Sequence, residues 1–218
     1  MDDKRSFKDA IYAELEMVGK AVSSRRRLEL LDVLSQGAHT VEQLAKETEM
    51  SVANTSQHLQ RLKKARLVST DRDGNSVYYR LADASVAAFV VQLRRLGEQR
   101  LPAIDETVES YFGDVPSATW DEVAGEIEVG QAVLIDTRPP EEYNSGHLPG
   151  AISVPADELE KRIDDLPQDK RLVAYCRGPY CTMAAEAVRR LSDAGYEAVT
   201  VDMSVPEFHV DERGEIER

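Results

Sequence analysis

Residues 172–187, LVAYCRGPYCTMAAEA, contain both cysteines of this 218-residue chain. The first four residues predict a buried strand, and the stretch from Thr182 to Ala194 predicts a helix. A loop between a strand and a helix directs backbone N–H groups and the positive end of the helix dipole inward. This environment lowers the pKa of a thiol and stabilises a thiolate or a persulfide. Cys176 is therefore the predicted nucleophile, with Arg177 adding positive charge at the rim; the alternative is an inert buried thiol.

The alternation of strand and helix continues on both sides of this loop. Residues 133–135 and 198–201 are short apolar runs that predict further buried strands, with helices between them. Such alternation is typical of an α/β domain with a parallel sheet, which we assign to residues 118–218. Residues 112–117 contain Gly113 and Pro116 and predict a linker to the preceding part of the chain.

Two segments resemble the signatures of rhodanese-like domains. The first is DTRPPEEY at 136–143 with GHLPGAI at 146–152, and the second is the cysteine loop with the start of its helix. The resemblance implies that Cys176 is the catalytic cysteine. Its loop would comprise six residues, Cys176 itself followed by Arg177, Gly178, Pro179, Tyr180 and Cys181. A loop of six residues implies, in this superfamily, a sulfurtransferase rather than a phosphatase or arsenate reductase. We expect Asp136 and Arg138 to form a buried or half-buried ion pair, and His147 to hold a loop.

The sequence departs from this family at two places. Cys181 occupies the sixth loop position, where arginine, serine or threonine is common, and Met203-Ser204 replaces the usual glycine pair near the end of the domain. Cys181 could attack a sulfenic acid or persulfide on Cys176, which gives a disulfide and, from the persulfide, releases sulfide. It could also join Cys176 as a ligand pair for arsenite or a soft metal, or merely line the loop.

The first half of the chain is mostly helical. Helices are predicted over residues 6–34, with a turn near Ser23–Ser24, and over 41–48, 52–65 and 84–100, the last continuing after Pro102 toward Tyr111. Two β-like runs, 67–70 and 76–81, flank a turn at 71–75. This order of elements predicts a winged helix-turn-helix domain, which we assign to residues 1–111.

The helix over residues 52–65 is the predicted recognition helix for double-stranded DNA. Its outward amides and hydroxyls can pair with base edges, and nearby cations can neutralise phosphates. The candidate contacts are Arg27, Asn54, Ser56, Gln57, Gln60, Arg61, Lys63, Lys64 and, in the wing, Arg72. For any one of these residues the alternative is an ordinary solvated helix face.

Residues 10–105 resemble the ArsR/SmtB family of repressors. The similar stretches are SSRRRLELL at 23–31, TVEQLA at 40–45, residues 51–59, LKKARLV at 62–68 and RDGNSVYYRL at 72–81. The resemblance implies a homodimer through the first and last helices and a palindromic operator. Many members sense metals through cysteine or histidine, but this domain has no cysteine, and its histidines, His39 and His58, are not on the last helix. We therefore expect no metal and no cofactor here, and assign any thiol sensing to Cys176 and Cys181.

The net charge of −13 is divided unevenly along the chain. Residues 1–100 carry 17 Lys and Arg against 14 Asp and Glu, whereas residues 101–218 carry 10 against 26. The two halves are expected to face different partners. No apolar run is long enough to cross a membrane, and no apolar signal core follows the start, so we expect a cytoplasmic protein.

These observations predict a DNA-binding transcription regulator, a repressor, whose reactive cysteine senses or transfers sulfane sulfur from a small donor or responds to an oxidant. Two alternatives stay open. One is a thiosulfate-type sulfurtransferase with catalysis as its main output. The other is an arsenite- or soft-metal-responsive regulator that uses Cys176 and Cys181.

Overall fold

The computed structural model describes residues 2–218, except for the side chain of Asp2. The chain forms two compact units, one up to Val90 and the other from Val91 to Arg218. The division therefore falls inside helix α5 (Ala84–Arg100), whereas the sequence predicts a linker at residues 112–117. None of the helices within residues 2–218 has the length and apolar composition needed to span a membrane.

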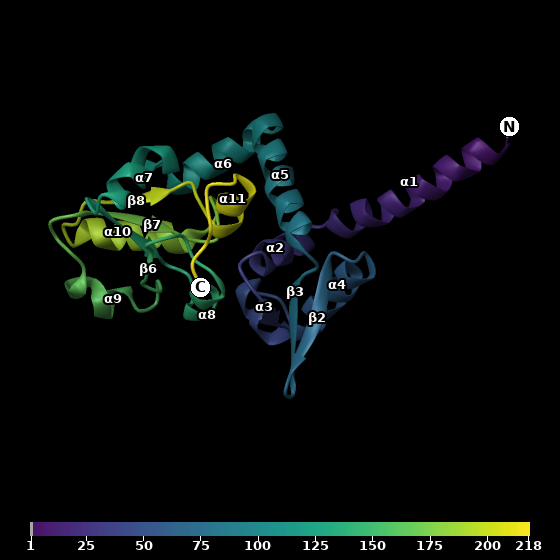
Figure 1. The fold of residues 1–218 in the computed structure, drawn as a ribbon, viewed down its shortest axis with the longest axis horizontal. Helices are drawn as coiled ribbons and strands as arrows, with labels where there is room; N and C mark the ends of the chain where they lie inside the picture. Colours follow the sequence, from purple (N-terminus) through teal and green to yellow (C-terminus); the bar gives the residue numbers. More distant parts are fainter. Residues whose placement is uncertain (1) are drawn as a thin grey trace. The chain divides into compact units, whose positions relative to one another are not determined.

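The first unit is a set of helices followed by a β-hairpin (Figure 1). Before α5, its elements are α1 (Asp2–Val22), α2 (Arg25–Leu34), β1 (His39–Thr40), α3 (Val41–Glu47), α4 (Val52–Lys64), β2 (Val68–Asp73) and β3 (Ser76–Leu81). The three strands form one antiparallel sheet in the order β1-β3-β2. This arrangement confirms the predicted winged helix-turn-helix fold.

Local sequence signals set the helix starts of this unit. Thr40 begins α3 with a capping box, in which Gln43 N donates to Thr40 Oγ1 (3.3 Å) and the Gln43 side chain accepts from Thr40 N (2.8 Å). Ser51 caps α4 by accepting from the backbone N–H of Asn54. Behind these caps, leucines from α2, α3 and α4 pack into one core that also includes Val86 and Val90 of α5.

The second unit contains a five-stranded sheet whose neighbouring strands pair in parallel, in the order β4-β8-β7-β5-β6. Its elements after α5 are α6 (Pro102–Phe112), β4 (Ser117–Ala118), α7 (Trp120–Glu128), β5 (Ala132–Asp136), α8 (Pro140–Ser145), β6 (Ile152–Ser153), α9 (Leu159–Arg162), a 3₁₀ turn η1 (Ile163–Asp165), β7 (Arg171–Tyr175), α10 (Thr182–Asp193), β8 (Ala198–Val201) and α11 (Val205–Val210). The predicted α/β class with a parallel sheet is thus confirmed.

Alternate residues of the central strand β7 serve two different cores. Leu172 and Ala174 pack with α10 on one side of the sheet, whereas Val173 and Tyr175 pack with residues of α7 and α11 on the other. Because both faces are covered, β7 is apolar throughout rather than alternating. Cys176 follows this strand and belongs to the core on the α10 side.

Two short segments differ from the sequence predictions. Strand β2 continues to Asp73, which pairs with Ser76, so the turn of the hairpin consists of Gly74 and Asn75 rather than residues 71–75. Gly74 has a φ of +57°, the left-handed backbone that such a tight turn requires. In the expected linker, Ser117 begins β4 and pairs with Thr200 of β8. Strand β4 lies at the edge of the sheet and has only two residues, too few for an alternating pattern to be recognised in the sequence.

Candidate functional site

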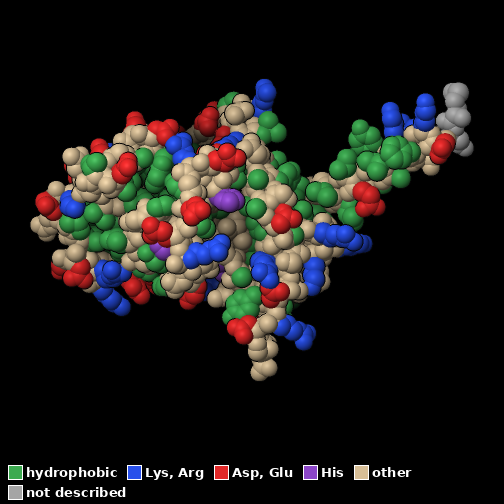
Figure 2. Space-filling view, viewed as in Figure 1, with side chains coloured by type: hydrophobic (Ala, Val, Ile, Leu, Met, Phe, Trp, Pro, Cys, Tyr) green, Lys and Arg blue, Asp and Glu red, His purple; other side chains and the backbone are tan. Residues whose placement is uncertain are grey.

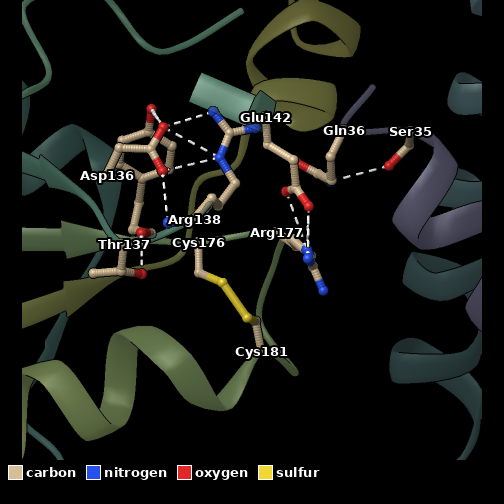
Figure 3. Close-up of a disulfide and its surroundings, with 10 residues drawn as sticks. Ser35, Gln36, Asp136, Thr137, Arg138, Glu142, Cys176, Arg177 and Cys181 are labelled. Atoms are coloured by element: carbon tan, nitrogen blue, oxygen red, sulfur yellow. Dashed lines mark hydrogen bonds and ion pairs between the residues drawn. A yellow bond between two sulfur atoms is a disulfide. The ribbon is translucent and has the colours of Figure 1, made fainter. Parts of the chain in front are cut away.

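Cys176 and Cys181 lie at the two ends of the loop between β7 and α10 and are joined by a disulfide, with their Cα atoms 6.2 Å apart (Figure 3). Cys181 is the N-cap residue of α10, so both sulfurs lie at the positive end of a twelve-residue helix. Gly178, midway along the loop, has a φ of +150°, a conformation that side chains rarely adopt. The sequence thus folds the loop tightly enough for its two thiols to bond to each other.

The disulfide lines a pocket of about 420 Å³. Its walls come from α6, the start of β4, α7, α10 and the C-terminal end of β8. The lining residues are Val108, Glu109, Phe112, Gly113, Val115, Ser117, Ala118, Thr119, Glu122, Cys176, Gly178, Pro179, Cys181, Ala184, Ala185, Thr200, Val201 and Asp202. Cys176 is otherwise buried, at 3% exposure, so this pocket is an approach by which a small molecule could reach its sulfur.

Arg177 makes a buried ion pair with Glu142 of α8 (Figure 3). Its Nη2 lies 2.6 Å from Glu142 Oε1, and the two side chains are 10% and 1% exposed. The expectation that Arg177 adds positive charge at the rim is therefore wrong. The guanidinium points to the carboxylate of Glu142 instead, because a charge that is largely removed from solvent is stable only when it is paired.

The pair Asp136 and Arg138 is present and fully buried at the end of β5, with Arg138 Nη2 2.6 Å from Asp136 Oδ2. Burial is the largest effect and opposes the charge of Arg138, but the hydrogen bonds and the charge of Asp136, together with Tyr175 and Glu142, outweigh it and raise the pKa of the guanidinium. The same guanidinium donates to the carbonyl of Gly146, and the hydroxyl of Tyr175 donates to Asp136. The first signature motif is thus tied to β7, the strand that leads to Cys176.

His147 has the structural place that the sequence predicted. Its ring stacks on Tyr143 at 3.8 Å between centroids, Nδ1 lies 3.0 Å from the carbonyl of Tyr143, and the backbone of His147 pairs with Glu217. These contacts hold the loop after α8.

The loop from Cys176 to Cys181 is hydrogen-bonded to the C-terminal half of α5. Tyr180 Oη donates to Glu98 Oε1 at 2.7 Å, and burial together with this carboxylate raises the pKa of Tyr180, so that the phenol keeps its proton. Arg94, one turn earlier, pairs with Glu98 and with the buried Glu207 of α11. Sequence reasoning missed these α5 residues, because contacts between residues 82 or more positions apart leave no local pattern.

A second ion pair joins α5 to Asp211, the C-cap residue of α11. Arg95 donates to both carboxylate oxygens of Asp211, at 2.7 and 2.8 Å. The hydrogen bonds from Arg95 lower the pKa of Asp211 despite its partial burial. The C-terminal half of α5 is therefore fixed to the unit that holds the cysteines.

The candidate DNA contacts lie on or near α4 and on the hairpin. Those with exposed side chains are Asn54, Gln57, Gln60, Arg61, Lys63, Lys64 and Arg72, and Ser56 is half-buried. Lys63 Nζ donates to Thr70 of β2 at 2.7 Å, so this residue joins the helix to the wing. On the face shown in Figure 2, acidic side chains are scattered widely over the second unit.

Arg27 does not belong to this exposed set. It is 7% exposed, and its guanidinium donates to the carbonyls of Lys20 (2.9 Å) and Ala21, so it closes the turn between α1 and α2. Its assignment as a phosphate contact is therefore corrected. The sequence offers three successive arginines, and only the packing of α1 on α2 decides which one turns inward.

Residues 2–218 contain no group of three or more His, Cys, Asp or Glu side chains placed to hold a metal ion. A two-thiolate site would have to use the two sulfurs that form the disulfide.

Comparisons with known proteins agree with both halves of this description. Residues 24–70 match the model of the bacterial regulatory protein arsR family, and residues 119–209 match that of the rhodanese-like domain. The chain is 39% identical over 204 residues to the HTH-type transcriptional regulator Rv0324 of Mycobacterium tuberculosis, covering 93% of this chain and 90% of that protein.

Two further matches cover single halves of the chain. It is 36% identical over 84 residues to a tRNA sulfurtransferase of Pyrobaculum aerophilum, covering 38% of this chain and 17% of that protein. A solution structure of a homodimeric winged helix-turn-helix fragment from Mycobacterium bovis is 37% identical with a TM-score of 0.42, covering 43% of this chain and 87% of that one.

Proposed function

This chain is a transcription regulator of the ArsR family with a C-terminal rhodanese-like domain, and from this premise we propose that it binds operator DNA as a repressor whose affinity changes when Cys176 accepts sulfane sulfur. The observation that carries the proposal is the cysteine loop itself. Its ends hold two thiols close enough to bond, and its Tyr180 is hydrogen-bonded to α5, the helix that leads out of the DNA-binding unit.

The chemistry needs two steps at these sulfurs. The Cys176 thiolate attacks the outer sulfur of a persulfide R–S–SH, the S–S bond breaks, and R–S⁻ leaves. The Cys181 thiolate then attacks Sγ of the Cys176 persulfide and displaces HS⁻, which forms the disulfide. Two thiols lose two electrons, and the sulfane sulfur gains them as sulfide. The position of both sulfurs at the N-terminus of α10 supports this proposal, because the helix dipole favours each thiolate.

The connection to DNA runs through α5. Its first half packs in the core of the first unit through Val86 and Val90, and its second half holds Glu98 and Arg94, which contact the loop and α11. A side chain at Gly178 would lie 3.2 Å from Arg94 Nη1, so the loop and this helix are in direct contact. A change of bonding between the cysteines would therefore act on a helix shared with the DNA-binding unit.

The dimer would form through α1 and α5, as the family resemblance implies. Phe7, Ile11 and Leu15 of α1 recur at intervals of four residues and are exposed, at 66%, 49% and 58%. Leu96 of α5 is also exposed, at 53%. Exposed apolar stripes of this kind are typical of surfaces that a partner covers, here a second copy of the chain.

Operator release on sulfur treatment tests the proposal. The probe is a duplex selected by this protein from a random library, and binding is measured by fluorescence anisotropy before and after polysulfide, with intact masses of the same samples. We expect wild type to change affinity and to form the disulfide, Cys181→Ser to stop at a gain of one sulfur, and Cys176→Ser to do neither. Identical release by wild type and Cys176→Ser would refute the sensing role.

DNA binding itself is tested on the exposed cations. Arg61→Ala should weaken binding of the selected duplex and reduce the slope of log K against log salt by about one, as the loss of one phosphate contact requires. Lys8→Ala is a control that removes one positive charge from an exposed residue of α1 that is not among the candidate contacts.

A sulfurtransferase output is the second candidate, and the pocket beside Cys176 favours it. A turning-over enzyme would form thiocyanate from cyanide continuously, whereas a sensor would load one sulfur per chain and stop.

A further inference from the structure

The pocket beside the disulfide carries a one-sided charge. Three carboxylates line it, those of Glu109, Glu122 and Asp202, and none of its lining residues, within the part of the chain that the structure describes, is Lys, Arg or His. Hydrogen bonds from Thr119 lower the pKa of Glu122, which keeps this carboxylate ionised. Asp202 accepts a hydrogen bond of 2.8 Å from the backbone N–H of Trp120.

The arginines near the pocket and the loop are each paired with other carboxylates. Arg171 acts on Glu122, and Arg95 and Arg213 act on Asp202. Their ion pairs, however, are with Glu126, Asp211 and Asp121, which do not line the pocket. Arg177 is paired with Glu142, and Arg94 is paired with Glu98 and Glu207. The remaining positive potential comes from the N-terminus of α10, which amounts to roughly half a unit charge and acts mainly on the sulfurs. An anion that approaches the disulfide therefore meets three carboxylates and no cation among the described lining residues, even though the helix N-terminus favours the thiolate itself.

The rest of the lining is apolar and limits the size of a ligand. Val108 and Phe112 of α6 and Val115 contribute the apolar surface. A volume of about 420 Å³ lies at the small end of the range for ligand pockets, enough for a carrier of a few heavy atoms beside the sulfur that is transferred.

We propose that this pocket selects low-molecular-weight persulfides whose carrier group is cationic or uncharged, an aminothiol persulfide above all, and disfavours anionic donors such as thiosulfate. This inference rests on the proposed function, because it names the donor class for the same cysteine. The transfer is the one given above: Cys176 takes the outer sulfur, the donor S–S bond breaks, and the carrier leaves as its thiolate.

Matched donors test the charge preference directly. The persulfides of cysteamine, 2-mercaptoethanol and 3-mercaptopropionate differ mainly in the charge of the carrier group. Rates of mass gain or disulfide formation are measured on the full chain, and each is divided by the rate of the same donor with a small model thiol. We expect the amine donor to react about tenfold faster than the carboxylate donor, and we expect high salt to reduce the difference.

A variant pair locates the preference in the pocket. Glu109→Gln should reduce the amine-to-carboxylate ratio by about twofold, because one of three similar charges accounts for about a third of the logarithm of the tenfold ratio. Glu106→Gln removes the same charge from the same helix at an exposed residue outside the pocket, and it should leave the ratio unchanged. Equal rates for all donors, a preference for the carboxylate donor or thiosulfate, or equal effects of the two variants would overturn the inference and leave the sulfur acceptor intact. No mass gain with any donor would overturn the proposed function as well.

Discussion

Removal of one hydroxyl group should uncouple the sulfur site from DNA. Tyr180→Phe deletes the 2.7 Å hydrogen bond to Glu98 and keeps the ring. A hydrogen bond to a charged group contributes about 1.5–3 kcal/mol, but Tyr180 is 45% exposed and Glu98 30%, so solvent reduces the contribution to about 1 kcal/mol. If this hydrogen bond forms in only one of the two states, reduced or disulfide, its full free energy contributes to the difference in DNA affinity between those states. About 1 kcal/mol corresponds to about a fivefold difference in affinity.

The assay is a pair of dissociation constants. Binding of the selected duplex is measured for the reduced and the disulfide form of wild type and of Tyr180→Phe, and the ratio of the two constants is compared. We expect Tyr180→Phe to shrink the wild-type ratio by about fivefold. Tyr111→Phe is the control, because it removes a hydroxyl from α6 and keeps the ring that Arg189 contacts. If Tyr180→Phe has the same ratio of dissociation constants as wild type, coupling through the Tyr180–Glu98 hydrogen bond is refuted.

Three further predictions concern stability. Arg27→Met should lower the free energy of unfolding by about 1–3 kcal/mol in thermal denaturation, because two carbonyls of the α1–α2 turn lose their donor; an unchanged melting temperature would contradict its structural role. Asp136→Asn should cost about 3–5 kcal/mol in urea unfolding, because Arg138 stays charged and buried without its carboxylate, and a loss below about 1 kcal/mol would argue against this pair as a key support. The Arg95–Asp211 pair should stabilise the protein at pH values above the pKa of about 3.9 that Asp211 has in the unfolded chain. Because the pKa of Asp211 is lowered in the folded protein, this stabilisation is lost as the pH falls through that lowered pKa. The urea midpoints of wild type and Arg95→Gln should therefore converge in acid, and a gap that stays constant with pH would refute this prediction.

The features that could be predicted from the sequence are those formed between residues close together along the chain. Thr40 and Ser51 cap helices through residues three positions away, so their signals are local. The Asp136–Arg138 pair is equally local, because two residues at the end of one strand suffice to form it.

The missed contacts depend on tertiary packing. Glu98 meets Tyr180 only because α5 lies against the cysteine loop, and the inward turn of Arg177 needs Glu142, which is 35 residues away. A charged residue type indicates that the side chain is costly to bury. It does not indicate whether a partner far away in the sequence offsets that cost. This is why Arg177 and Arg27, both expected at the surface, are buried against partners instead.

The wall that α6 supplies to the pocket has a consequence for how this protein can be divided. A fragment that begins at residue 118 keeps the whole rhodanese signature, yet it lacks Val108, Glu109 and Phe112, and with them one side of the approach to Cys176. It also lacks Arg94 and Glu98, so the buried carboxylate of Glu207 loses its ion-pair partner and keeps the hydroxyl of Ser204, and the hydroxyl of Tyr180 loses the carboxylate to which it donates. The two family segments are therefore not interchangeable modules. Grafting this sulfur site onto another regulator would require the transplant to begin within α5, near residue 91.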